Sequence, residues 1–182
     1  MLKNIKSILF ESLETFAVSS AVLLVVYMFV AFPIVVYGAS MEPSLHTGER
    51  ILVEKISFYF DDVSRGDVVV LYPPGNDSVE YVKRVIGLPG EIVKVYECVI
   101  YISKDGKKFM LVEPYLSKEQ CTAGGQKFRE GRSVKVDEGQ YVVLGDNRER
   151  SADSRLFGPI QKDRILGKAI FRFWPLDKIG LL

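Results

Sequence analysis

The stretch FAVSSAVLLVVYMFVAFPIVV, residues 16–36, is a long apolar run without a charged residue. As a helix it would extend about 31 Å, which is enough to cross the hydrocarbon core of a bilayer once. Pro33 lies near the C-terminal end of the run, where a kink is tolerated. We therefore predict a transmembrane helix over residues 16–37.

Basic residues are distributed unevenly around this run, and they predict its orientation. Lys3 and Lys6 precede it, whereas the nearest basic residue after it is Arg50. The positive-inside rule then places residues 1–15 in the cytoplasm and residues 38–182 outside the membrane. A cleaved signal peptide is the alternative, but the run is longer than the apolar core of most signal peptides.

The composition is that of a globular domain attached to a membrane segment. Of the 182 residues, 48% are hydrophobic and 12% are aromatic, which is typical of a folded rather than a disordered chain. Lys and Arg number 24 against 23 Asp and Glu, for a net charge of +1. Because proteins that bind nucleic acids usually carry a basic excess, we expect no nucleic-acid partner.

Beyond the apolar run, short apolar stretches alternate with Gly, Pro and Asp, a pattern typical of strands and turns. Asp105-Gly106 separates two such stretches and predicts a hairpin turn. A polar, Gly-containing insertion is expected around residues 116–134. The predicted fold class is mainly β, an antiparallel β-sheet domain on one N-terminal transmembrane helix. The predicted strands are residues 51–56, 68–71, 79–86, 91–102, 109–112, 140–144 and 165–174.

Cys98 and Cys121 are the two cysteines, and His46 is the one histidine. The cysteines lack the C-x-x-C spacing of structural zinc sites, so we expect no metal, and no other cofactor is indicated. Outside the membrane the two thiols could form a disulfide. They could equally stay unpaired, and the sequence does not decide between these alternatives.

Ser40 lies shortly beyond the apolar run, where the chain would leave a membrane. A serine hydroxyl held there could act on a chain that is itself emerging from the bilayer, provided that a base removes its proton. His46 follows six residues later, in a stretch that resembles a turn. We interpret this histidine as a solvated loop residue rather than as the base.

Lys83 is the better candidate for the base. Alternate side chains of a strand face opposite ways, so Lys83 is the only charged residue on its face of the predicted strand 79–86. Burial disfavours the ammonium form, and a drop of about 2–3 units from the usual lysine pKa would make the amine a useful base. The alternative is that the amine reaches solvent from the strand end. The other members of that face are Val79, Tyr81 and Val85.

Four blocks of sequence follow one another along the chain: SMEPSL (residues 40–45), GDVVVL (66–71), YVKRVIGLPGE (81–91) and GDNRERSADSR (145–155). In kind, order and rough spacing they resemble the type I signal peptidases, membrane-anchored Ser/Lys proteases that remove signal peptides from exported proteins. The resemblance extends to the closing FRFWP at residues 171–175. One block alone is modest support, whereas four in order behind an apolar segment are highly specific.

The resemblance implies a role for each matching position. Ser40 would be the nucleophile and Lys83 the general base. Ser151 would form a hydrogen bond with Lys83 and orient its amine, which a flexible lysine side chain needs. The bracing ion pairs that the resemblance implies are Asp153 with Arg155 and Asp146 with Arg84.

Gly38 departs from the pattern of many family members, which have a serine at this position whose hydroxyl helps to form the oxyanion hole. Other members carry glycine, as this chain does. The backbone N–H of Ser40 is available as one donor to the oxyanion. The sequence does not identify the second donor.

The resemblance also implies the partners and the location. Substrates would be preproteins bearing signal peptides, cut after small residues by a monomer in a bacterial plasma membrane, with its catalytic domain on the extracytoplasmic side. The substrate would lie extended against a strand edge near residues 79–83. The expected substrate-binding residues are Val79, Tyr81 and Met41.

Two further interpretations stay open at the level of sequence. The segment ISFYF, residues 56–60, could belong to the core or could form an apolar edge at the bilayer interface. The protein could also be a non-catalytic membrane-anchored scaffold, although a scaffold needs no lysine on an apolar face. A self-cleaving Ser/Lys regulator is the other rival, but such proteins usually carry a DNA-binding domain, for which we find no room.

Overall fold

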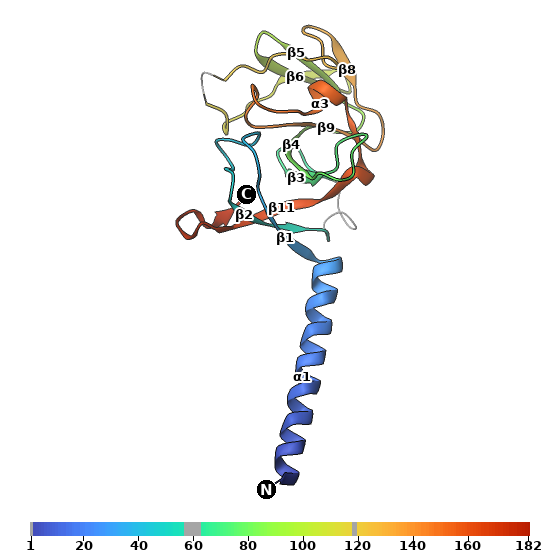
Figure 1. Ribbon diagram of the computed structural model, residues 1–182. Coiled ribbons are helices and arrows are strands. Elements are labelled where there is room, and N and C mark those ends of the chain that lie inside the picture. The colour runs from blue at the N-terminus through green and yellow to red at the C-terminus, as the bar shows by residue number, and fades with distance from the viewer. Residues whose placement is uncertain (1, 57–62, 118–119) are drawn as a thin grey trace.

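A computed structural model describes residues 2–56, 63–117 and 120–182. One long helix projects from a β domain that contains two antiparallel sheets (Figure 1). The helix joins the domain beside β1, β2 and β11, and the second sheet lies at the far end of the domain. The predicted fold class, mainly antiparallel β with an N-terminal apolar helix, is confirmed.

The helix α1 (Leu2–Phe29) contains a segment, Ser7–Phe29, that is long and apolar enough to cross a membrane. None of the side chains in its most apolar window is buried against the rest of the protein. An apolar surface of this length with no protein cover fits a lipid environment. The segment is therefore a candidate membrane span.

The predicted helix over residues 16–37 is wrong at its C-terminal end, because residues 31–35 form the strand β1 (Ala31–Val35). Pro33 cannot donate a helical hydrogen bond, and the β-branched residues around it favour an extended chain. Pro33 is tolerated because β1 is the edge strand of its sheet. Phe32 and Val36 turn into the first of three hydrophobic clusters, where burial stabilises the extended form.

The main sheet has the strand order β1-β2-β11-β3-β4-β9-β10, with β12 paired to β11. The second sheet has the order β7-β6-β5-β8. In the main sheet the strands after β1 are β2 (Arg50–Glu54), β11 (Ile165–Trp174), β3 (Val68–Leu71), β4 (Tyr81–Gly87), β9 (Gln140–Leu144), β10 (Ile160–Gln161) and β12 (Gly180–Leu181). The second sheet contains β7 (Lys107–Met110), β6 (Val99–Lys104), β5 (Ile92–Tyr96) and β8 (Ser133–Lys135). Short helices are α3 (Ser154–Phe157), η1 (Lys162–Arg164) and η2 (Leu176–Lys178).

Most predicted strands are present, and three of them have the predicted bounds. The single strand predicted over residues 91–102 is wrong, because the chain reverses at Glu97 and Cys98, both of which have positive φ, and forms the hairpin of β5 and β6. The predicted turn at Asp105-Gly106 is present between β6 and β7. Among its described residues, the segment over residues 116–134 enters a strand only at its end, where β8 begins. Residues 57–60 of the segment ISFYF lie outside the described residues.

Cys98 and Cys121 form a disulfide, which settles the alternative that the sequence left open. The bond joins the turn between β5 and β6 to the segment that contains Cys121. Among the described residues there is no free cysteine.

Close packing of β11 against β2 yields a test of the fold. A Cβ added at Gly167 would lie 2.5 Å from the Glu54 carbonyl oxygen and 2.7 Å from Val53 Cγ1, so Gly167→Ala must shift one strand. We expect a loss of about 1–3 kcal/mol of unfolding free energy, measured by denaturant unfolding in detergent. Gly180→Ala is the matched control, because a Cβ there meets no atom within 4 Å. Equal stability of the two variants would contradict the packing.

Candidate active site

Ser40 and Lys83 lie 43 residues apart in the chain and meet in the structure. Lys83 Nζ donates a hydrogen bond of 2.8 Å to Ser40 Oγ and a second of 2.9 Å to the Val82 carbonyl oxygen. Ser40 lies in the turn after β1, and Lys83 is the third residue of β4. The turn and the strand therefore bring a hydroxyl and an amine to hydrogen-bonding distance.

Lys83 is buried, with 2% of its surface exposed. Its cross-strand partner on β3 is the fully buried Val69, and its Nζ lies 4.9 Å from the centre of the Tyr81 ring. Burial lowers the pKa of the Lys83 amine from 10.5 to about 8, while the charges of Asp153 and Asp146 act in the opposite direction. The amine can therefore lose its proton near neutral pH.

Arg84 and Asp146 form a two-pronged ion pair beside the lysine. Arg84 Nε donates to Asp146 Oδ1 at 2.9 Å, and Nη2 donates to Oδ2 at 2.7 Å. The pair forms because Arg84 lies opposite Leu144 in the register of β4 and β9, and Asp146 follows two residues later. Desolvation lowers the pKa of Arg84, but its contacts with Asp146 outweigh this and leave the pKa raised, so the arginine stays charged.

Asp153 and Arg155 form a second pair of this kind. Arg155 donates from Nε to Asp153 Oδ1 at 2.9 Å and from Nη2 to Oδ2 at 2.8 Å. Asp153 also caps the N-terminus of α3 and accepts the Gly145 backbone N–H at 3.1 Å. This carboxylate consequently joins Gly145, directly after β9, to Arg155 in the first turn of α3.

Ser151 does not make the contact that we expected. The described hydrogen bonds of Lys83 Nζ go to Ser40 and Val82, and the buried Ser151 hydroxyl has no hydrogen-bond partner among the described residues. Its oxygen packs against Gly145, where an added Cβ would clash with both Ser151 Oγ and the Ser40 carbonyl oxygen. Ser151 is thus near the pair by packing, while the Val82 carbonyl holds the amine.

A cavity of about 720 Å³ opens beside Ser40 and Lys83. One wall is residues 34–41 and another is residues 77–83, and the expected substrate-binding residues Val79, Tyr81 and Met41 all line it. Val79 is exposed, Tyr81 is half-buried and Met41 is buried. The cavity therefore lies between two segments of extended or turning chain.

The described polar contacts of His46 and Gly38 are with residues other than Ser40 and Lys83. His46 Nδ1 lies 3.7 Å from Glu49 Oε1 on a side chain that is 45% exposed, and it makes no described contact with Ser40. The Gly38 carbonyl accepts a hydrogen bond from Thr47 Oγ1 at 3.1 Å, which fixes the backbone before Ser40. In the described part of the chain, no group of His, Cys, Asp or Glu residues is placed to hold a metal ion.

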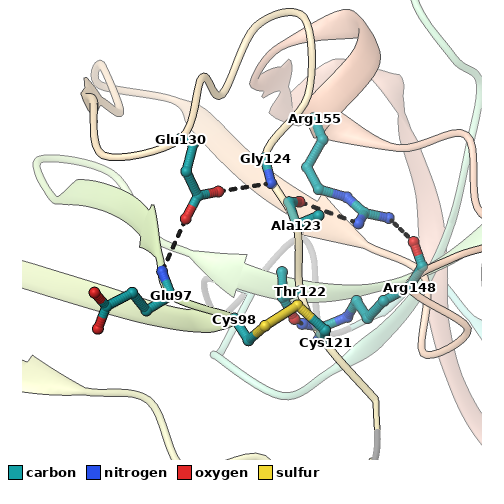
Figure 2. Close-up of a disulfide and its surroundings, with 9 residues drawn as sticks. All are labelled: Glu97, Cys98, Cys121, Thr122, Ala123, Gly124, Glu130, Arg148 and Arg155. Atoms are coloured by element: carbon teal, nitrogen blue, oxygen red, sulfur yellow. Dashed lines mark hydrogen bonds between the residues drawn. A yellow bond between two sulfur atoms is a disulfide. The ribbon is translucent and has the colours of Figure 1, made fainter.

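Sequence reasoning missed a buried polar cluster behind the pair. Arg148 has a fully buried side chain that donates to Glu113 and to Thr122 Oγ1, and Tyr115 donates to Glu113 at 2.5 Å. Figure 2 shows Thr122 beside the disulfide and Arg148 reaching toward it. The position of Arg148 within the block of residues 145–155 could have indicated that it is a functional residue. No pattern in the sequence indicates that its partner is Glu113.

Comparison with known proteins identifies the family of the chain. The family model described as signal peptidase, peptidase S26, matches residues 9–174. The chain belongs to this signal peptidase family. The matched region includes the candidate membrane span from residue 9 onward and all four sequence blocks that contain or flank Ser40 and Lys83.

Individual relatives match over nearly the whole chain. The signal peptidase I of Bacillus licheniformis is 41% identical over 97% of this chain and 94% of its own. The signal peptidase IB of Staphylococcus aureus strain Mu50 is 39% identical over 95% and 93%. A crystal structure of a signal peptidase I from Enterococcus faecalis is 32% identical, with a TM-score of 0.48 over 59% of this chain and 97% of that one.

The burial of Lys83 yields a test that does not depend on catalysis. Below pH 8 the amine is charged in both the folded and the unfolded chain, so the folded state carries the full cost of burying it. A pKa of about 8 instead of 10.5 corresponds to about 3 kcal/mol. We expect Lys83→Met to be more stable than the parent at pH 7 in denaturant unfolding.

The stability advantage of Lys83→Met should shrink as the pH rises from 8 to 10.5, because the folded parent then releases its proton before the unfolded chain does. Lys107→Met is the matched control, since Lys107 is exposed and folding does not desolvate it. An advantage of Lys83→Met that stays constant over this pH range would contradict a buried, titrating amine.

Proposed function

We propose that this protein is a membrane-bound endopeptidase that cleaves signal peptides from exported preproteins after small residues, with Ser40 as nucleophile and Lys83 as general base. The observation that carries the proposal is the 2.8 Å contact between Lys83 Nζ and Ser40 Oγ. It occurs beside a cavity, on a buried lysine, in a chain of the signal peptidase family. Membership of that family supports signal peptide cleavage as the reaction.

The mechanism begins with the neutral amine. Lys83 takes the proton of Ser40 Oγ as this oxygen attacks the scissile carbonyl, and the Ser40 backbone N–H stabilises the oxyanion. The ammonium of Lys83 then gives its proton to the leaving amine, which departs as the new N-terminus of the mature protein. Water activated by Lys83 hydrolyses the acyl-enzyme and frees the signal peptide with a new carboxylate. Since only neutral Lys83 starts the reaction, the rate should rise with pH through about 8.

Substrate is proposed to enter the cavity as an extended strand. β1 pairs with β2 on one side, and β4 pairs with β9 only from Arg84 onward. The stretch over residues 81–83 therefore has an edge toward the cavity, as does β1 across it. A peptide between these two edges would gain main-chain hydrogen bonds and place its scissile carbonyl at Ser40.

The supporting residues are proposed to hold the base in place. Arg84 and Arg155 each donate two side-chain hydrogen bonds to a carboxylate near Lys83, Asp146 and Asp153 respectively. Among the described residues, neither carboxylate accepts a hydrogen bond from the Lys83 amine. Ser151 is proposed to act by packing, because its buried hydroxyl lies against Gly145 next to the Ser40 carbonyl.

We propose that α1 spans a bacterial plasma membrane, with its N-terminus in the cytoplasm and the β domain outside. The candidate span Ser7–Phe29 ends two residues before β1, so the cavity lies close to the bilayer surface. The reactive pair and the cavity are formed by one chain, which suits a monomer. A preprotein whose signal peptide stays in the bilayer would present its cleavage site at this height.

The turn between β11 and β12 is proposed to rest on the same bilayer. It lies near the helix end of the domain in Figure 1. The amphipathic Trp174 suits the interface between water and lipid, and three aliphatic neighbours add exposed apolar surface. The exposed apolar side chains of this turn and of the strand ends that flank it are Trp174, Leu176, Ile179 and Leu181.

Two substitutions test the catalytic assignment. Ser40→Ala and Lys83→Met should each lower cleavage of a model preprotein in detergent by about a thousandfold or more, because each removes a group that moves in the reaction. His46→Ala is the control and should retain most activity. Folding is checked by thermal unfolding of each variant. Substantial turnover by folded Lys83→Met would exclude this base, and loss of activity in His46→Ala would favour a Ser-His mechanism.

The rival functions predict different outcomes for the purified parent chain. A scaffold should not cleave the model preprotein at any pH, and a self-cleaving regulator should break into two fragments at elevated pH. We expect an intact enzyme and a cleaved preprotein, which electrophoresis of the same sample distinguishes.

Trp174 is the only tryptophan and so reports directly on lipid contact. In proteoliposomes we expect its fluorescence to be quenched by lipids brominated on the acyl chains and protected from aqueous iodide. Leu176→Ser combined with Leu181→Ser should weaken the lipid quenching without loss of the fold. Strong iodide quenching with no effect of brominated lipid would place this turn in water.

A further inference from the structure

We propose that the disulfide-linked brace, defined as residues 113–117 and 120–130, positions the Ser40–Lys83 pair, and that Glu113 and Thr122 are positioning residues for the reaction. The proposal rests on the proposed function, since it concerns how that pair is held. Glu113 and Thr122 lie outside the four sequence blocks. Both residues contact Arg148, and they therefore act on the reacting groups only indirectly.

The first contact between the brace and the site is made by Arg148. Its Nη1 donates to Glu113 Oε2 at 3.1 Å and also to Thr122 Oγ1, and Nη2 donates to Glu113 Oε1. Its Nε donates to the Gly145 carbonyl at 2.9 Å. There is no room for a Cβ at Gly145, because Ser151 and the Ser40 carbonyl fill that space. A displaced Arg148 would therefore move the backbone against which Ser40 packs.

The second contact is made by Arg155, the partner of Asp153. Arg155 Nη1 donates to the Ala123 carbonyl at 3.4 Å, and the Arg155 carbonyl accepts the Lys127 N–H at 2.9 Å. A Cβ at Gly125 would lie 2.5 Å from the Arg155 carbonyl oxygen, so the two backbones are in close contact. The brace thus also fixes the position of Arg155, which forms the ion pair with Asp153.

The two contacts are one unit, because Arg155 Nη2 donates to the Arg148 carbonyl at 2.7 Å (Figure 2). Removing either side of the brace therefore disturbs both arginines. Arg148 is the more sensitive of the two, since its side chain is fully buried and Glu113 is its carboxylate partner among the described residues. A buried guanidinium without a counterion is strongly unfavourable and must move or attract water.

The brace itself is attached to the second sheet through the disulfide. Cys121 is bonded to Cys98 at the β5–β6 turn, and the next residue, Thr122, donates its N–H to the Cys98 carbonyl at 3.3 Å. Glu130 accepts the N–H groups of Glu97 at 2.8 Å and Gly124 at 3.1 Å. Figure 2 shows the disulfide directly below the chain that carries these contacts toward Arg155. The disulfide therefore tethers the part of the brace that contacts Arg148.

Glu113 is also linked to the other ion pair near Lys83. Tyr115 donates its hydroxyl to Glu113 Oε1 at 2.5 Å, and the Arg84 guanidinium lies 4.1 Å from the centre of the Tyr115 ring. Arg84 in turn holds Asp146. One carboxylate therefore supports Arg148 directly and Arg84 through a tyrosine.

Loosening the brace should admit water to the surroundings of Lys83. The groups that face the amine are the Ser40 hydroxyl, the Val82 carbonyl, the Tyr81 ring and the carboxylates of Asp153 and Asp146. Burial is the main cause of the lowered pKa of Lys83, so hydration would raise this pKa from about 8 toward 10.5. Less of the amine is then neutral at pH 7, and the rate falls there.

The test compares pH profiles of kcat/KM for the full chain in detergent with a model preprotein. We expect Glu113→Gln, and separately the double variant Cys98→Ala with Cys121→Ala, to move the rising limb upward by about half a pH unit or more. The rate should fall at least about threefold at pH 7 and recover toward the parent value near pH 10, because a shift of half a unit changes the neutral fraction by that factor. Glu149→Gln is the matched control, because Glu149 is an exposed carboxylate next to Arg148 in the sequence.

Reduction of the parent with a phosphine should reproduce the profile of the cysteine double variant and should leave that variant unchanged. If Glu113→Gln does not fold, Thr122→Val and the conservative Glu113→Asp provide the same comparison. Profiles that overlap with the parent, or that are lowered equally at every pH, would overturn the positioning role. Failure of the proposed function is distinguishable, because then Ser40→Ala retains activity or the parent itself shows no rising limb near pH 8.

Discussion

The burial of one amine is the constraint on which the rest of the structure depends. Lys83 projects from β4 into a face where Val69, Val85 and Val143 are fully buried, and its hydrogen bonds go to a hydroxyl and a carbonyl. A charged lysine is unfavourable there, which is what makes its neutral form accessible. A direct ion pair between Lys83 and a carboxylate would stabilise the charged amine and raise its pKa again.

The arginines around the site prevent that ion pair. Asp153 and Asp146 both raise the pKa of Lys83, yet each is engaged by an arginine that donates two side-chain hydrogen bonds to it. The carboxylates are consequently held in place by the planar guanidinium groups of Arg84 and Arg155. Two negative charges therefore remain near the Lys83 amine, while burial stays the larger influence on its pKa. Arg148 is likewise paired with a carboxylate, that of Glu113, and it also donates to Thr122. The disulfide between Cys121 and Cys98 links this cluster to the second sheet.

The path from the helix to Ser40 explains why the site lies near the end of α1. The chain leaves the helix at Phe29, forms β1 at the edge of the main sheet and turns at once into the segment with Ser40. The edge of β1 lines the same cavity as residues 77–83. The strand β1 replaces the last turns of the predicted helix and forms one wall of the cavity. A helix that continued to residue 37 would not provide this wall.

The amino-acid sequence by itself determined the apolar span, the β class, the face of Lys83 and the four blocks, because these follow from local periodicity and from short motifs. It also indicated the pairs Asp146–Arg84 and Asp153–Arg155 through the resemblance. Only the tertiary structure decided that Cys98 and Cys121 are bonded, that Val82 rather than Ser151 holds the amine, and that Glu113 supports Arg148. These contacts join residues whose proximity depends on how sheets and loops pack, and no local pattern encodes that packing. The end of the helix was decided in the same way, since pairing with β2 and burial of Phe32 outweigh the apolar continuity of the run.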